Sequence, residues 1–338
     1  MRRYEQIYVN GGWIPTGGTG AIDVFDSTNG QVIGSTPAGA AEDVDLAAAA
    51  ASAAFPAWAA LTTAERATHL RAVADALEER SDELLDVIIR ETGMPKPASS
   101  VAQVAHPVFS FRTAADLAES FDYEETIGNS LVVKEPIGVV GCITPWNYPL
   151  RQVAAKVAYA MTAGCTVVLK PTEVAPIDSF ILAEACHAAG LPAGVFNLVS
   201  GYGPIVGEAI ASHPLIDMVS FTGSTRAGTR VAELAAKTAK KVALELGGKG
   251  PNVLLEDPPP SSSPLPSPRV SDDASRTPAR PARPSPACWF RHHAWTRLPP
   301  SPQRLPTVSL SAIRSPRAPS SDRWPQPCIV IGSRTTSE

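Results

Sequence analysis

The stretch GVVGCITPWNYPLRQVAAKVAYAMTAGCTVVLKPTE, residues 138–173, decides the fold of this chain. Residues 138–143 and 165–169 are short β-branched runs of the kind found in parallel strands that are buried on both faces. The Ala-rich segment between them, 150–163, carries apolar residues at helical spacing. A strand, a helix and a second strand in this order predict a βαβ unit, and hence an α/β fold.

Polar groups follow both of these strands. Two prolines bracket Asn147 and stiffen the backbone that displays its amide, while Lys170 and Glu173 close the second strand. Because ligands of open parallel sheets bind at the carboxyl ends of strands, the three residues predict a site. Taken singly, each has a simpler interpretation: Asn147 could cap the following helix, and Lys170 could be a surface lysine.

The rest of the chain up to about residue 250 extends this pattern. Further strands are expected at 131–134, 195–199, 217–221 and 241–245, and further helices at 178–189, 203–211 and 225–239. Strands that alternate with helices predict parallel βαβ units. Before them, short strands fill the first 37 residues, and helices are expected at 42–58, 63–90 and 99–121. Thr63 and Arg66 make a poor capping box for the second of these helices, and Gly93 is typical of a helix stop.

Two further motifs lie at expected strand ends. In FTGSTRAG, residues 221–228, Gly223 and Ser224 open a helix whose free N–H groups suit a pyrophosphate. Alone this signal is weak, because a strand–Gly–helix junction is more often turn chemistry. In VALELGGK, residues 242–249, Glu245 is either a general base in a dry cleft or a solvated strand-end carboxylate.

Composition excludes several classes of protein. The net charge of −4 argues against a general nucleic-acid or membrane-surface binder, and no apolar run approaches the roughly 20 residues of a membrane span. Five irregularly spaced cysteines favour a reducing, cytoplasmic location, with Cys142 and Cys165 as packed thiols. The six histidines are too scattered to predict a metal site.

The last part of the chain differs from the rest. Residues 258–338 contain 18 prolines, 15 serines, 11 arginines and no lysine. So much proline forbids regular helices, and few apolar side chains are present to offset the entropy of ordering. We therefore expect a folded domain at 1–257 and a disordered tail at 258–338. An alternative reading frame of GC-rich DNA would encode this composition, and we favour that origin over a designed linker.

The motifs ITPWNYP, GCTVVLKPTE, FTGSTRAG and LELGGK follow one another in this order. With the N-terminal YVNGGW, they make the span from Tyr8 to about Asp257 resemble the NAD(P)-dependent aldehyde dehydrogenase superfamily. The resemblance implies a Rossmann-like parallel sheet with flanking helices, a nicotinamide cofactor, a small aldehyde as substrate and a homo-oligomer.

The resemblance also implies roles for individual residues. The implied catalytic pair is Asn147, in the oxyanion hole, and Glu245, as the general base. The implied cofactor-binding residues are Ile143, Trp146, Lys170, Glu173, Gly223 and Ser224. Lys170 and Glu173 would contact the adenosine ribose, where a carboxylate repels a 2′-phosphate, so NAD is favoured over NADP.

The resemblance stops after about residue 257. The family's GQxC segment with the nucleophilic cysteine, its EIFGP-like motif and its oligomerisation strand have no match in the tail, and Cys288 lacks the family context. By ancestry we expect NAD-dependent oxidation of an aldehyde to a carboxylic acid, inactive in this chain and with oligomerisation impaired. A non-catalytic nucleotide-binding remnant is the alternative, and a regulator whose basic tail binds an acidic partner is a third hypothesis.

The DNA around codon 257 tests the interpretation of the tail. We expect that one of the two possible one-base shifts, forward or backward, restores an open reading frame that encodes a GQxC segment. The reason is that the amino-acid composition changes abruptly at this codon. Translation of all three frames of the sequenced gene is the measurement. If no frame encodes such a segment, the frameshift interpretation is wrong.

Overall fold

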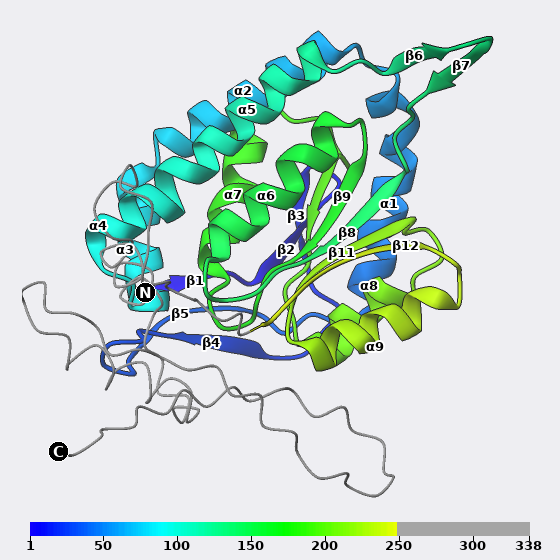
Figure 1. Ribbon diagram of the computed structural model, residues 1–338. Helices are drawn as coiled ribbons and strands as arrows, with labels where there is room; N and C mark the ends of the chain where they lie inside the picture. Colours follow the sequence, from blue (N-terminus) through cyan, green and yellow to red (C-terminus); the bar gives the residue numbers. More distant parts are fainter. Residues whose placement is uncertain (249–338) are drawn as a thin grey trace, which may run out of the picture. The chain divides into compact units, whose positions relative to one another are not determined.

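The computed structural model describes residues 1–248, so the predicted tail at 258–338 lies outside the described residues. A seven-stranded sheet runs through the centre in the order β12-β11-β8-β9-β10-β2-β3 (Figure 1). Its parallel strands are β8 (Val139–Ile143), β9 (Thr166–Lys170), β10 (Phe196–Leu198), β11 (Met218–Gly223) and β12 (Lys241–Leu246). The hairpin of β2 (Gln6–Val9) and β3 (Gly12–Pro15) continues the sheet antiparallel to β10. The predicted α/β fold is therefore confirmed.

Helices cover both faces of this sheet. One face carries α6 (Pro149–Thr162) and α7 (Ile177–Ala188), backed by α2 (Thr63–Glu78), α3 (Ser81–Thr92) and α5 (His106–Ser120). The other face carries α1 (Ala41–Ala59), α8 (Glu208–Ser212) and α9 (Thr225–Ala236). We call these the α6 face and the α1 face.

Alternation along the strands builds a separate core on each face. In β8, Val140 and Cys142 belong to the core of the α6 face, whereas Val139 and Ile143 belong to that of the α1 face. A strand that is buried on both sides must be apolar at every position, which explains the continuous apolar run in the sequence.

Shorter elements complete the described part. A small sheet has the order β1-β5-β4, from β1 (Arg2–Arg3), β5 (Val32–Pro37) and β4 (Ala21–Phe25). The predicted helix at 99–121 consists of the π-helical η1 (Ser100–Ala105) and α5, preceded by the short α4 (Lys96–Ser99), and the one at 203–211 consists of the π-helical η2 (Gly203–Gly207) and α8. No helix of residues 1–248 is long and apolar enough to cross a bilayer.

The strand expected at 131–134 was wrongly assigned to the parallel sheet. It is β7 (Ser130–Val133), which pairs antiparallel with β6 (Glu124–Ile127) in a separate hairpin that projects from the body (Figure 1). Only residues 134–138 separate β7 from β8, which is too short for a crossover between parallel strands. Gly128, at φ 62°, makes the turn of this hairpin.

The capping box of α2 lies one residue earlier than expected. Thr62, not Thr63, is the N-cap: its hydroxyl accepts from the Glu65 backbone N–H at 3.2 Å, and the Glu65 carboxylate accepts from the Thr62 N–H at 2.8 Å. The reciprocal pair satisfies two N–H groups at the helix start. The expected stop at Gly93 is confirmed, since it ends α3 in the left-handed conformation at φ 72°.

Replacement of the N-cap tests this assignment. Thr62→Ala should lower the free energy of unfolding by about 1 kcal/mol, because the Glu65 backbone N–H loses the hydroxyl that caps it. Thr63→Ala, at the first position inside the helix, is the matched control and should change stability by less than about 0.5 kcal/mol. Denaturant unfolding measures both; equal losses in the two variants would contradict the assignment.

Candidate active site

The order of the strands creates a switch point in the sheet. From β8 the chain moves to β9 and β10 on one side, and then returns to β11 and β12 on the other. The helices that follow β8 and β11 therefore lie on opposite faces, and a crevice opens at the carboxyl ends of these two neighbours. The segments after β8, β9 and β11, and the end of β12, are the four that carry the predicted site residues.

The strand register divides the predicted residues between the two faces. Glu245 pairs with Thr222, and Ser220 pairs with Cys142, so these side chains lie on the α6 face. Lys170 pairs with Ile143, which belongs to the core of the α1 face. The candidate base and the candidate ribose contact thus lie at one edge of the sheet but on opposite sides of it.

The turn that carries Asn147 is held by hydrogen bonds from a side chain that the sequence did not predict. Gln103, buried in η1, donates from Nε2 to the Asn147 carbonyl at 3.5 Å and accepts from the Arg151 N–H at 3.4 Å. The Asn147 Oδ1 accepts from the N–H of Tyr148 at 3.1 Å, so the donor of this half-buried side chain is its Nδ2 amide. π-Helical turns such as η1 often mark functional sites, but nothing in the local sequence predicts one here.

Lys170 and Glu173 form an ion pair at the end of β9. The Lys170 side chain is buried, and its ammonium donates to the Pro171 carbonyl at 2.9 Å and to Glu173 Oε2 at 3.1 Å. Burial lowers the pKa of Lys170, an effect that the charge of Glu173 opposes. The Glu173 side chain keeps 35% of its surface exposed, so it can accept hydrogen bonds from a ligand while it holds the lysine.

Gly223 and Ser224 lie where β11 ends and α9 begins. Ser224 is the N-cap, and its exposed side chain accepts from the Ala227 N–H at 3.3 Å. A Cβ at Gly223 would stand 2.6 Å from the ring of Phe221, so no larger residue fits without movement. Because residues 224–227 are exposed, the start of α9 can present its N–H groups and positive dipole to an anion.

The two remaining predicted residues, Ile143 and Trp146, differ in exposure. Ile143 ends β8 and is 7% exposed, with its side chain in the core of the α1 face. Trp146, in the turn after β8, is half-buried. A ligand at this edge would therefore reach the backbone of Ile143 rather than its side chain.

Lys156 is a second residue that sequence reasoning missed. From α6 its ammonium donates to Ser220 Oγ at 3.0 Å, and it lies close enough to Glu245 for the two charges to interact. Burial lowers the pKa of Lys156, an effect that the charge of Glu245 opposes. One signal for Lys156 was available in the sequence. Lys156 lies next to the apolar Val153 and Val157 on the helix, and this places it near the side of α6 that faces the sheet.

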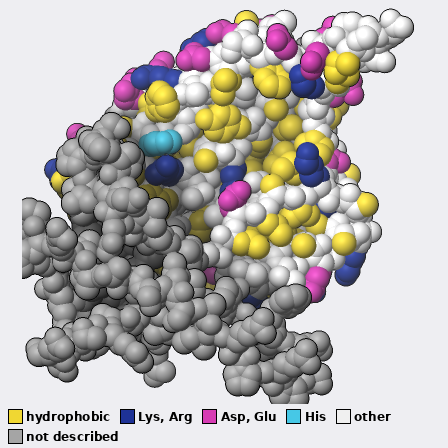
Figure 2. Space-filling model, viewed as in Figure 1, with side chains coloured by type: hydrophobic (Ala, Val, Ile, Leu, Met, Phe, Trp, Pro, Cys, Tyr) yellow, Lys and Arg dark blue, Asp and Glu magenta, His cyan; other side chains and the backbone are white. Residues whose placement is uncertain are grey.

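Glu245 itself is exposed, on β12, which is one of the two edge strands of the described sheet. Figure 2 shows hydrophobic side chains gathered on this side of the molecule, between α6 and β12. Among the described residues, the Thr144 and Thr222 hydroxyls at the ends of β8 and β11 are buried and make no hydrogen bond. Buried hydroxyls without partners are uncommon in folded proteins, although those of Thr36 and Thr162, away from this edge, also lack one.

The cysteines of the described region offer no nucleophile. Cys142, Cys165 and Cys186 are all buried, as expected for the first two. Burial raises the pKa of Cys142 to about 12 and also raises the pKa values of the other two thiols. A thiol that stays protonated at neutral pH is a poor nucleophile.

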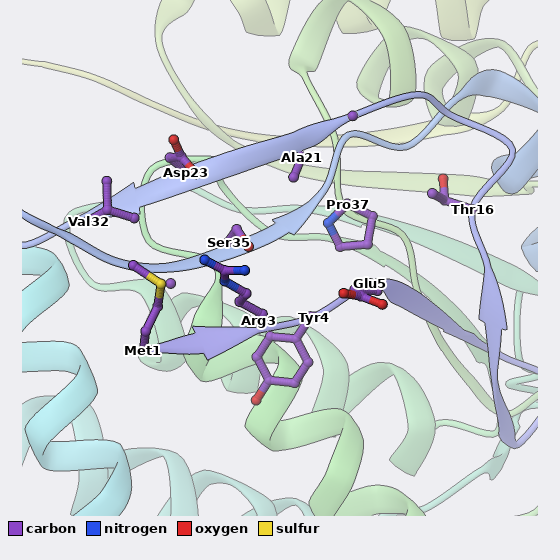
Figure 3. Close-up of a pocket in the computed structure, with 12 residues that line it drawn as sticks. Met1, Arg3, Tyr4, Glu5, Thr16, Ala21, Asp23, Val32, Ser35 and Pro37 are labelled. Carbon is purple, nitrogen blue, oxygen red and sulfur yellow. The ribbon is translucent and has the colours of Figure 1, made fainter.

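An open pocket of about 370 Å³ lies elsewhere, against the small sheet of β1, β4 and β5 (Figure 3). Arg3, Glu5, Asp23 and Ser35 are among the residues that line it, and none of the predicted site residues does. The candidate site is therefore the sheet edge and not this pocket.

Comparison with known proteins gives consistent matches. The model of the aldehyde dehydrogenase family matches residues 13–258. A 3-succinoylsemialdehyde-pyridine dehydrogenase of a Pseudomonas species is 46% identical over 262 residues, which cover 76% of this chain and 54% of that protein.

Solved structures match the same region. A variant of aldehyde dehydrogenase C of Pseudomonas syringae, in complex with NAD+ and octanal, is 45% identical with a TM-score of 0.72, over 74% of this chain and 52% of that one. An NADP-dependent enzyme of E. coli is 40% identical with a TM-score of 0.70, over 72% of this chain and 52% of that one.

The chain thus spans about half the length of the relatives it matches. The matched region of this chain, residues 13–258, contains most of the seven-stranded sheet and every predicted site residue. By these matches, the chain belongs to the aldehyde dehydrogenase family.

Proposed function

We propose that residues 1–248 bind NAD, and that they are the cofactor-binding part of an enzyme that oxidises an aldehyde to a carboxylic acid. The observation that carries the proposal is the convergence of the segments after β8, β9 and β11 on one edge of the sheet, at the switch point. The relative from P. syringae, in complex with NAD+ and octanal, supports the same assignment.

The α1 face would hold the adenosine half of the cofactor. Glu173 would accept hydrogen bonds from the ribose hydroxyls while Lys170 holds its carboxylate in place at 3.1 Å. The open start of α9, at Gly223 and Ser224, would bind the pyrophosphate with its N–H groups. NAD when bound supplies the two-electron acceptor that the oxidation requires.

The preference for NAD over NADP would rest on the charge of Glu173. A 2′-phosphate on the ribose would meet this carboxylate, and the repulsion is only partly offset by the ammonium of Lys170. Relatives of both kinds exist, since the P. syringae enzyme binds NAD+ and the E. coli enzyme is NADP-dependent.

The α6 face would hold the reacting end of the substrate. The Nδ2 amide of Asn147 would donate to the oxygen on which negative charge develops, with the turn held still by Gln103. Glu245 would take a proton from the nucleophile or from water, and the ammonium of Lys156 would lie beside it.

The nucleophile is the group that residues 1–248 do not supply. Their three thiols are buried among core residues and cannot reach an aldehyde at the sheet edge. Cys288 lies outside the described residues. We therefore propose that residues 1–248 bind NAD but do not by themselves turn over aldehydes.

Cofactor binding by the full chain tests the first part of the proposal. We expect NAD to bind more tightly than NADP, and Glu173→Gln to reduce that preference roughly three- to tenfold, because one repulsive charge is removed. Isothermal titration with both cofactors measures the ratio. Glu79→Gln, which removes an exposed charge at the end of α2, is the matched control.

Two results would contradict this part. If neither cofactor binds in the titration, the edge of the sheet is not a nucleotide site. A preference that stays the same in Glu173→Gln would remove Glu173 from the ribose contact.

Aldehyde turnover tests the second part. At saturating NAD we expect no NADH from propanal, benzaldehyde or octanal, because a base and an oxyanion donor cannot act without a nucleophile within about 3 Å of the carbonyl. Absorbance at the NADH band is the measurement, with Cys288→Ala alongside. NADH formation that Cys288→Ala abolishes would show that the chain supplies its own thiolate.

A further inference from the structure

Arg151, in the first turn of α6, is a cation that no acidic side chain of residues 1–248 neutralises. Among these residues, ion pairs with acidic side chains hold Arg2, Arg71, Arg80, Arg90, Arg112 and Arg230. The buried Arg66 donates to backbone carbonyls instead. Arg3 and Arg226 also lack an acidic partner in this part of the chain, but they are exposed, whereas Arg151 is half-buried. A half-buried arginine beside a candidate site is a possible contact for an anionic ligand.

A buried amide ties the backbone of Arg151 to that of Asn147. Gln103 Oε1 accepts from the Arg151 N–H at 3.4 Å, while Nε2 of the same amide donates to the Asn147 carbonyl at 3.5 Å. In an unbroken helix these two backbone groups would bond to each other, since they are four positions apart. Here one side-chain amide fills the gap between them, so Arg151 stays close to the turn that carries the candidate oxyanion donor.

The guanidinium of Arg151 is held on the same turn. It lies over the ring of Tyr148, 5.6 Å from the ring centre. Tyr148 directly follows Asn147, and its N–H donates to Asn147 Oδ1 at 3.1 Å. An aromatic face attracts a cation but does not neutralise its charge. The contact therefore positions the guanidinium next to Asn147 and leaves its charge available to a ligand.

The two elements that Gln103 joins carry positive charge and no negative charge. α6 contains Arg151 and Lys156 but no acidic residue, and η1 contains no charged residue. Lys156 is already engaged, since it donates to Ser220 Oγ at 3.0 Å and interacts with Glu245. The start of α6 adds the positive end of its helix dipole. An anion at this place would thus be attracted by Arg151 and by the helix start together.

We propose that the aldehyde oxidised at this site carries a carboxylate of its own, which the guanidinium of Arg151 binds while the Asn147 amide faces the aldehyde group. A guanidinium suits this role because its N–H groups can donate in parallel to both carboxylate oxygens. The closeness of Arg151 to Asn147 fits a short chain between the two groups of the substrate. The carboxylate changes no bond in the reaction and only orients the aldehyde. This substrate class rests on the proposed function, which assigns the aldehyde to the α6 face.

A charged and an uncharged aldehyde test the substrate class. Succinate semialdehyde carries a carboxylate, and butanal has the same number of carbon atoms without one. We expect the full chain to bind succinate semialdehyde roughly tenfold more tightly than butanal, because a charge-assisted contact is added. Isothermal titration with each compound, in the absence of NAD, is the measurement. Equal affinities, including no measurable binding of either compound, would overturn the proposal.

Three variants test whether Arg151 provides the contact. Arg151→Gln removes the charge and should abolish the preference, while Arg151→Lys keeps the charge without the paired N–H groups and should retain part of it. Arg3→Gln removes an exposed arginine that lies away from the candidate site and should keep the full preference. Because Gln103 accepts from the backbone of residue 151, none of these changes removes the bridge to Asn147. A preference that survives Arg151→Gln, or that Arg3→Gln loses equally, would overturn the role of Arg151.

Titrations repeated at saturating NAD distinguish a failure of this proposal from a failure of the proposed function. If NAD does not bind but the preference for succinate semialdehyde is present, the cofactor site is wrong and the carboxylate contact stands. If NAD binds and the preference is absent, the substrate class is wrong and the cofactor site stands.

Discussion

Parallel strands must end at the same edge of their sheet, and the rest of this structure depends on that constraint. Each crossover from β8 to β9 and from β11 to β12 needs a helix long enough to return the chain to the opposite edge, and α6 and α9 serve as those helices. The polar residues that follow the strands are thereby gathered in one place, although the chain separates Asn147 from Glu245 by most of the sheet. Where no such helix exists, as between β7 and β8, the strand leaves the sheet and forms a hairpin of its own.

The two faces of that edge separate two kinds of chemistry. On the α1 face a buried lysine holds an acidic residue beside the open start of a helix, an arrangement suited to hydroxyls and phosphates. On the α6 face an amide donor, a carboxylate and a partly buried ammonium surround the outer strands. A dinucleotide laid across the crevice between β8 and β11 would have its adenosine on the first face and its reactive ring near the second.

Two lysines near the same edge are at least partly buried and are held by polar partners. Lys170 is neutralised by Glu173, and Lys156 is held by Ser220. Burial of an ionised group costs several kcal/mol unless hydrogen bonds or an opposite charge offset it. Each of these groups has such a partner, and each partner comes from a different part of the chain or from the far end of the same turn. The edge is therefore held rigid by polar contacts, while the middle of the sheet is held by apolar packing.

The sequence by itself determined the α/β class and the central strands and helices, because buried parallel strands are apolar throughout, and it predicted site residues from the polar groups that follow those strands. It failed at β7, whose apolar run has the same local pattern as a buried strand, and at the N-cap of α2, where Thr62 and Thr63 both have the chemistry of a cap. Only the tertiary structure decided which face each residue lies on, since that depends on the strand register that sets Glu245 opposite Thr222 and Lys170 opposite Ile143. It alone brought Gln103 to the Asn147 turn, Lys156 toward Glu245 and Glu91 to the start of α7, because contacts between residues 44 or more positions apart depend on how helices pack and leave no periodic trace in the chain.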